Sequence, residues 1–174
     1  MMINPFGESY PEEDSKNELT LNRIKEYIEQ GGVFVCTGGW PFYYADSPQG
    51  IFGDKKSRVP DRTRVKRFFN VRIDDSQWWP ERKLLSQSDG STSKYGPLVN
   101  KGGSDRVTVW RPIHEDCGAV EKILTTSDKR YTVLGIQQMG QGKIIMTGMA
   151  LEGPSEFEKL ASFLEIILTM NPQS

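Results

Sequence analysis

The residues best suited to chemistry lie in one short stretch, in which an apolar run ends on Cys36 and is followed by paired glycines: Gly31-Gly-Val-Phe-Val-Cys-Thr-Gly-Gly-Trp40. β-Branched and aromatic residues bounded by glycine pairs predict a strand buried on both faces, as in parallel sheets. Ligands of open α/β sheets bind where such strands end. We therefore expect the binding site there, formed by Thr37, Gly38, Gly39, Trp40, Phe42 and Tyr43.

Cys36 is also the candidate nucleophile. A thiol that faces backbone amides at a strand end has a lowered pKa and can attack a carbonyl when a base lies within hydrogen-bond reach. His114 is the one histidine of the chain, and Glu115, Asp116 or Glu152 could orient it. The catalytic hypothesis thus names Cys36, His114 and Glu152. The competing interpretation is that Cys36 is a small buried side chain, as most free cysteines are.

A second candidate site is a basic segment from position 55 to 67, in which Asp61 is the one acidic residue. The segment is either a solvated face or a contact for an anion or phosphate group. The second interpretation predicts binding that weakens steeply with salt, although the chain has no phosphate-loop lysine motif. The predicted anion ligands are Lys55, Lys56, Arg58, Arg62 and Arg64.

Composition limits the protein class. The chain has 174 residues, 36% of them hydrophobic, and a formal net charge of -1, which fits one folded domain over residues 1–174. It has no apolar run of roughly 20 residues and no signal-peptide pattern. We expect a cytoplasmic protein that binds neither membrane nor nucleic acid. Two cysteines and one histidine predict no disulfide framework, no metal site and no cofactor.

The predicted elements would place these residues. Ser15 and Glu18 have capping-box spacing, and apolar residues at helical intervals predict a helix over 18–30, followed by a strand over 33–37. Met2 and Ile3 suit the end of a preceding strand. Residues of about 45–104 suit a loop-rich insertion. Further on, we expect a strand over 106–112, a hairpin of 131–137 with 143–148, and a terminal helix that begins near Ser155.

These fragments together resemble the class I glutamine amidotransferase-like superfamily over the first 45 residues and residues 131–170. Active members carry a cysteine on a sharp strand-to-helix turn, often as Cys-x-Gly, which Cys36-Thr-Gly38 matches. The resemblance implies a flavodoxin-like α/β fold: a three-layer sandwich with a mostly parallel sheet, a C-terminal β-hairpin and a terminal helix.

Two departures from that family shape the functional hypothesis. Active members have His-Pro-Glu where this chain has Met149-Ala-Leu-Glu152, so the histidine is missing. The family's opening βα segment is missing too, which predicts an N-terminally incomplete domain with a strand edge that seeks a partner.

The leading hypothesis is a non-catalytic or divergent domain that binds a small molecule or a protein at the carboxyl edge of its sheet. It would belong to a homo-oligomer or a larger chain. A cysteine hydrolase or amidotransferase and a nucleotide or polyanion binder are the alternatives.

Overall fold

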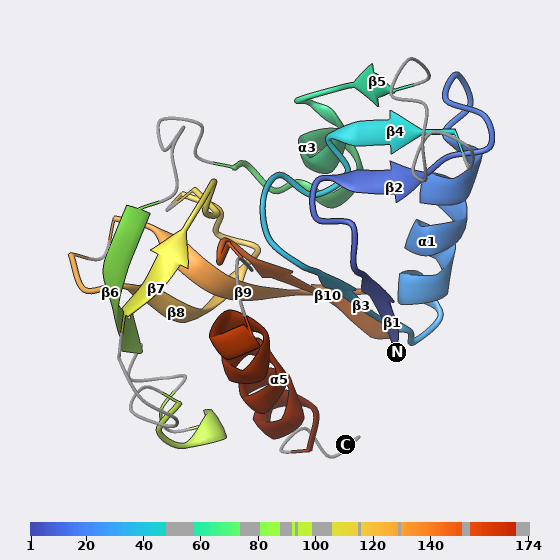
Figure 1. Ribbon diagram of the computed structural model, residues 1–174. Coiled ribbons are helices and arrows are strands. Elements are labelled where there is room, and N and C mark those ends of the chain that lie inside the picture. Colours follow the sequence, from blue (N-terminus) through green and yellow to red (C-terminus); the bar gives the residue numbers. More distant parts are fainter. Residues whose placement is uncertain are drawn as a thin grey trace.

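A computed structural model of the chain describes residues 1–47, 58–73, 81–87, 92, 94–98, 106–114, 116–128, 130–150 and 154–169. The fold is α/β and is built on a seven-stranded mixed sheet (Figure 1). In spatial order, its strands are β1 (Met2–Asn4), β3 (Val33–Cys36), β10 (Gly142–Thr147), β9 (Thr132–Met139), β8 (Glu121–Thr126), β6 (Glu81–Gln87) and β7 (Arg106–Val109).

Parallel pairing in this sheet is limited to β1, β3 and β10, whereas every pair from β10 to β7 is antiparallel. It follows that β1, β3, β10, β8 and β7 all run in the same direction, with β9 and β6 opposed. Their carboxyl ends therefore share one edge of the sheet, which we call the carboxyl edge. The loops after β1, β3, β7 and β10 meet there.

A small second sheet extends beyond the carboxyl edge (Figure 1). It has the order β2 (Ser9–Pro11), β4 (Tyr44–Asp46) and β5 (Val59–Pro60), with β2 and β4 parallel. The short helix α3 (Arg64–Phe69) follows β5. The loop after β3 leads directly into β4, and the small sheet therefore fixes the far end of that loop.

Two helices cover opposite faces of the main sheet, so the expected three-layer arrangement is confirmed. Phe34 on β3 packs in one core with residues of α1 (Leu19–Glu29), whereas its neighbour Val35 packs in a second core with residues of α5 (Pro154–Thr169). Successive strand residues point to opposite faces, and this alternation produces the two cores. None of the described helices is long and apolar enough to cross a membrane.

The helix expected over 18–30 is confirmed, but its capping box is not. Glu18 has a positive φ of 50°, and its side chain makes no cap hydrogen bond. Instead, the buried carboxylate of Glu12 accepts hydrogen bonds from the backbone N–H groups of Thr20 and Leu21 at 2.9 and 3.3 Å. The helix is therefore capped by a residue of the preceding segment.

The other predicted elements of the C-terminal third are present. β7 matches the strand expected after residue 106, β9 and β10 form the expected hairpin, and α5 is the expected terminal helix. Met2 and Ile3 do lie in a strand, β1, at the sheet edge. The flavodoxin-like expectation is wrong, because antiparallel strands occupy the sheet beyond β10. The single-domain assignment stays a prediction. Within its proposed insertion, the described residues include β5, α3 and β6.

Candidate binding site at the carboxyl edge

Five side chains from three loops gather at the carboxyl edge, and we call them the aromatic–arginine cluster: Glu8 after β1, Trp40 and Tyr43 after β3, and Trp110 and Arg111 after β7. The guanidinium carbon of Arg111 lies 4.9, 5.8 and 5.9 Å from the ring centres of Trp110, Trp40 and Tyr43. The rings of Trp40 and Tyr43 stack at 5.7 Å. Arg111 also forms an ion pair with Glu8. A cation enclosed by aromatic faces is electrostatically favoured.

Hydrogen bonds and one close backbone approach fix the loops that carry this cluster. Thr37 Oγ1 donates a hydrogen bond to the carbonyl oxygen of Asn4 at 2.6 Å, which links the loops after β1 and β3. The backbone N–H of Trp110 donates a hydrogen bond to the carbonyl oxygen of Gly148 at 2.8 Å. Gly38 has a φ of +73°, and a Cβ there would lie 2.5 Å from the carbonyl oxygen of Met149. Only glycine suits that position, because the left-handed backbone and the close approach both exclude a side chain.

The charges of the cluster are balanced internally. The side chains of Glu8 and Arg111 are only 12% and 14% exposed. Glu8 Oε1 also accepts the Trp40 backbone N–H at 3.0 Å. By contrast, the indole Nε1 atoms of Trp40 and Trp110 are buried without a hydrogen-bond partner. The cluster thus offers aromatic faces and a neutral ion pair to a ligand or partner, and it contains no nucleophile.

Cys36 lies at the end of β3, as expected, but its thiol is fully buried. Burial strongly raises the pKa of the Cys36 thiol, because a buried thiolate loses its hydration. A nucleophilic cysteine needs the opposite shift. The geometry therefore supports the structural interpretation of Cys36 over the catalytic one.

His114 is engaged elsewhere. Its Nδ1 lies 2.7 Å from Asp116 Oδ1, and its backbone N–H donates to the carbonyl of Arg72 at 2.8 Å. Asp116 also pairs with Arg72 at 2.6 Å. Among the residues described, no hydrogen bond joins His114 to Cys36. Of the proposed orienting acids, Asp116 does contact the histidine, whereas Glu115 and Glu152 lie outside the described residues. The two described members of the proposed triad, Cys36 and His114, are therefore not hydrogen-bonded to each other.

The predicted ligand-binding residues divide into three groups. Trp40 and Tyr43 belong to the cluster, whereas Thr37, Gly38 and Gly39 shape the backbone that carries it. Phe42 is a core residue instead: it is fully buried, and its ring contacts those of Tyr10, Phe34 and Phe69.

Sequence reasoning missed Glu8, Trp110 and Arg111. One signal pointed to Trp110 and Arg111, since they lie at the end of the strand predicted over 106–112, directly before Pro112. Within the described ranges, no group of three metal-binding side chains is present.

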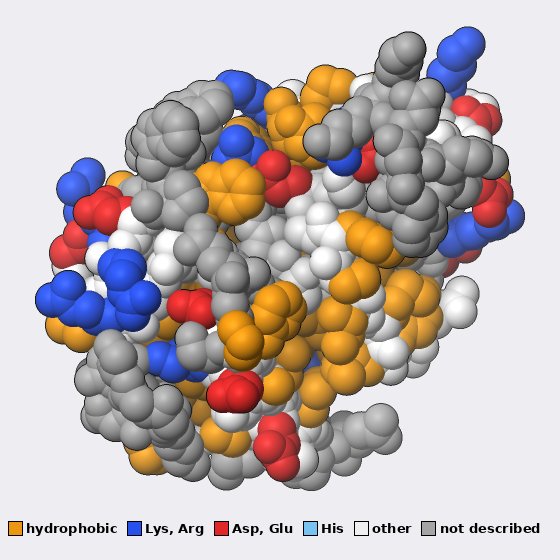
Figure 2. Space-filling view, in the orientation of Figure 1, with side chains coloured by type: hydrophobic (Ala, Val, Ile, Leu, Met, Phe, Trp, Pro, Cys, Tyr) orange, Lys and Arg blue, Asp and Glu red, His pale blue; other side chains and the backbone are white. Residues whose placement is uncertain are grey.

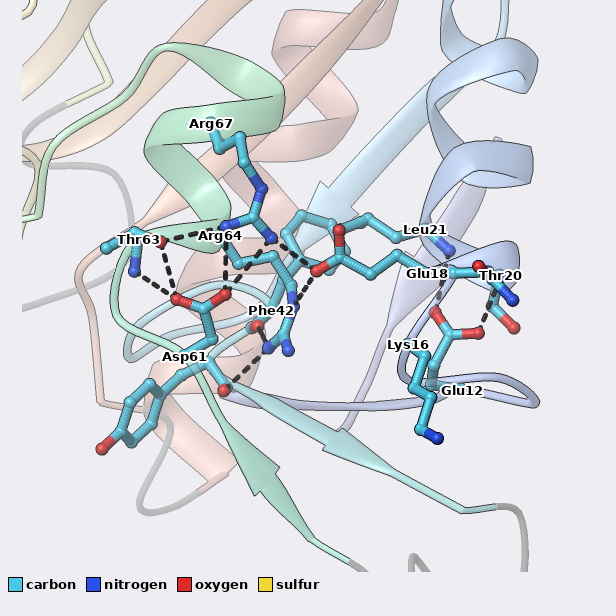
Figure 3. Close-up of polar contacts among 12 residues, drawn as sticks. Glu12, Lys16, Glu18, Thr20, Leu21, Phe42, Asp61, Thr63, Arg64 and Arg67 are labelled. Atoms are coloured by element: carbon cyan, nitrogen blue, oxygen red, sulfur yellow. Dashed lines mark hydrogen bonds and ion pairs between the residues drawn. The ribbon is translucent and has the colours of Figure 1, made fainter.

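Two arginines of the basic segment, Arg64 and Arg67, bind carboxylates and carbonyls (Figure 3). Arg64 is buried; its Nε donates to Glu18 Oε1 at 3.0 Å, and its Nη1 donates to the carbonyls of Phe42 and Tyr43 at 2.6 and 3.0 Å. Arg67 contacts the same Glu18 oxygen at 2.6 Å. Arg64 therefore anchors the loop after β3.

Two more predicted anion ligands, Arg58 and Arg62, contact acidic or aromatic side chains. Arg58 donates to Asp46 Oδ1 at 2.8 Å and lies 4.5 Å from the centre of the Tyr44 ring. Arg62 lies over Trp40 at 5.8 Å. Lys55 and Lys56 lie outside the described residues. Anion binding by this segment stays a prediction, and at Arg58 and Arg64 an anion would have to compete with the carboxylates of Asp46 and Glu18.

No protein-family model and no curated protein matches the chain, but solved structures do. A β-galactosidase from Bacillus circulans sp. alkalophilus matches with a TM-score of 0.54 and 12% identity over 94% of this chain and 22% of its own. A catalytic mutant of Gan42B, a GH42 β-galactosidase from G. stearothermophilus, matches with a TM-score of 0.53 and 18% identity over 99% of this chain and 22% of its own. The cytoplasmic protein STM1381 from Salmonella typhimurium LT2 matches with a TM-score of 0.50 and 12% identity over 88% of this chain and 61% of its own.

At these identities the matches establish likeness of fold alone. The chain spans 22 to 23% of the β-galactosidases that it matches. The resemblance to the glutamine amidotransferase-like superfamily is wrong, because the structural neighbours are β-galactosidase segments and STM1381 instead. The misleading signal was the Cys-x-Gly fragment after a short strand. Glycine-rich strand ends are common in α/β proteins, so that fragment does not identify a family.

Proposed function

We propose that this chain is a non-catalytic binding domain that engages another protein through the aromatic–arginine cluster, the simplest partner being a second copy of the chain. One observation carries the proposal. Trp40, Tyr43, Trp110 and Arg111 converge at the carboxyl edge, while the only thiol on the adjoining strand, that of Cys36, is buried.

The composition of the cluster supports a protein partner. Tryptophan, tyrosine and arginine are the residue types most enriched at the energetic centres of protein interfaces. Here, Tyr43 and Trp110 are half-buried, so a partner could cover them with little side-chain reordering. Because Arg111 is already paired with Glu8, docking would not leave a charge buried without a counter-ion.

The whole chain also suits self-association. Its formal net charge is only -1, so two copies repel each other weakly, and a net charge near zero promotes association. In the matched β-galactosidases a segment of this fold makes up 22 to 23% of the chain. The fold therefore occurs there as one part of a larger protein, which supports a role as an accessory domain.

Sedimentation velocity across about 1–200 µM protein tests the proposal. We expect concentration-dependent association, with Tyr43→Ala and Trp110→Ala each weakening it by about tenfold or more, as for hot-spot residues. Phe157→Ala is the matched control, because it removes an exposed aromatic ring on α5. Circular dichroism of each variant would verify folding.

A chain that sediments as a monomer throughout this range would contradict the proposal. An equal loss of association in Phe157→Ala would also contradict it, because the contact would then be a general hydrophobic effect. Thiol-dependent hydrolysis that Cys36→Ala abolishes would overturn the non-catalytic assignment.

A further inference from the structure

A pocket of about 280 Å³ lies between the edge strand β1 and the helix α1. Its walls include Ile3, Phe6, Tyr10, Ile24 and Phe34. It shares no lining residue with the aromatic–arginine cluster, so it is a separate feature of the molecule. Its volume is near the lower end of the range for small-molecule sites, about 300–1,000 Å³.

The mouth of this pocket is apolar. Met2, Ile3 and Phe6 line it and are 44%, 45% and 41% exposed, which is unusual for large hydrophobic side chains. Figure 2 shows hydrophobic side chains gathered over the β1 side of the sheet. Clustered exposed apolar side chains around a concavity mark binding sites. An apolar ligand body would remove this surface from water and gain about 25 cal/mol per Å² of apolar area buried.

A positively charged side chain lies at the rim of the pocket. Among the described lining residues, Arg23 on α1 is the one with a charged side chain. Its Nη1 lies 3.6 Å from Glu13 Oε2, and both side chains are exposed. An exposed pair of this kind contributes little stability. A guanidinium group can bind a carboxylate through two parallel hydrogen bonds, so a ligand carboxylate would compete well with Glu13.

We infer that this pocket binds a small molecule with an apolar body and a carboxylate head group. The body lies against Ile24 and Phe34, the buried walls that α1 and β3 contribute. The carboxylate lies on Arg23 at the rim. This charge complementarity distinguishes the ligand from a neutral apolar molecule of the same length.

Titration of the ¹⁵N-labelled protein with octanoate, followed by NMR, tests the inference. We expect amide shifts at Ile3, Thr20 and Ile24, with a dissociation constant on the order of 1 mM or tighter for a ligand of about ten non-hydrogen atoms. Octanamide has the same chain and a neutral head group. It should bind about fivefold to tenfold more weakly, because it loses the charge-assisted hydrogen bonds.

Two variants of α1 locate the head group. Arg23→Gln should bind octanoate and octanamide equally, whereas Lys25→Gln, which changes a half-buried lysine that does not line the pocket, should keep the preference for octanoate. Shifts spread over exposed residues elsewhere, or no shifts at the pocket, would overturn the inference. So would an Arg23→Gln protein that still prefers octanoate.

Discussion

At the scale of single residues, Glu18 shows how burial sets the value of an ion pair. Its Oε1 accepts hydrogen bonds from both Arg64 and Arg67, yet the arginine side chains are 2% and 48% exposed. We predict that Arg64→Leu lowers the free energy of unfolding by about 3–5 kcal/mol, because it leaves buried acceptors without a partner. Arg67→Leu should cost less than about 1 kcal/mol. Urea denaturation measures both.

Equal losses in the two variants would contradict this assignment. The loop after β3 gives an independent readout, since Arg64 also binds the carbonyls of Phe42 and Tyr43. Tyr43 amide exchange should accelerate in Arg64→Leu and stay unchanged in Arg67→Leu.

The burial of Cys36 predicts that the free energy of unfolding depends on pH. Burial raises the pKa of its thiol in the folded protein, so above the usual thiol pKa of about 8.5 the unfolded chain loses this proton while the folded chain keeps it. The unfolded state is then favoured, and stability falls as pH rises. The difference in unfolding free energy between wild type and Cys36→Ala should shrink by about 1.4 kcal/mol per pH unit above pH 9.

Guanidinium denaturation between pH 7 and 10.5 measures this difference. A difference that stays constant with pH would show that the thiol has an ordinary pKa in the folded protein, which would contradict its burial. A difference that grows between pH 7 and about 8.5 would show a lowered pKa, and that result would restore the catalytic hypothesis for Cys36.

Single residues of the site were predictable only where they neighbour a strong local signal. Trp40 and Tyr43 were found because they follow a strand that ends in glycines. Glu8 and Arg111 were missed because their ion pair spans 103 positions of the sequence, and nothing local marks either residue as a partner. Glu18 matched a capping box by spacing, yet its carboxylate pairs with arginines from α3.

At the scale of elements, the start of α1 depends on Glu12 rather than on the residue with capping-box spacing. Glu12 binds two N–H groups in the first turn, where orphan donors and the helix dipole both favour a carboxylate. We predict that Glu12→Ala costs about 1–2 kcal/mol of stability. Ser15→Ala changes an exposed residue and should leave the urea midpoint unchanged. A larger loss from Ser15→Ala would show that the capping box forms after all.

The sequence predicted the elements better than their pairing. Helical spacing located α1 and α5, and turn residues located the β9–β10 hairpin, because both signals are local. An apolar run such as Val33–Cys36, however, does not reveal which strands flank it. β3 lies between β1 and β10, and the latter is more than one hundred residues away along the chain. The direction of such long-range partners decides whether a sheet is parallel or mixed.

At the scale of the whole molecule, the sheet is stable only if both of its faces are covered, and α5 covers one of them. Phe163 on α5 is fully buried in the core that includes Val35 and Ile145, whereas Phe157 on the same helix is 55% exposed. We predict that Phe163→Ala lowers the free energy of unfolding by about 3–5 kcal/mol, the usual cost of a large cavity in a core. Phe157→Ala should change it by less than about 0.5 kcal/mol.

This pair also tests whether the chain unfolds as one unit. Because Val35 packs against the α5 side and Phe34 against the α1 side, loss of one core weakens the strand β3 on which the other core also packs. Phe163→Ala should therefore lower the urea midpoint equally for α1 and α5, monitored by amide signals from each helix. If α5 melts while α1 keeps its wild-type midpoint, the two cores are independent, and the two faces of the sheet do not form a single cooperative structure.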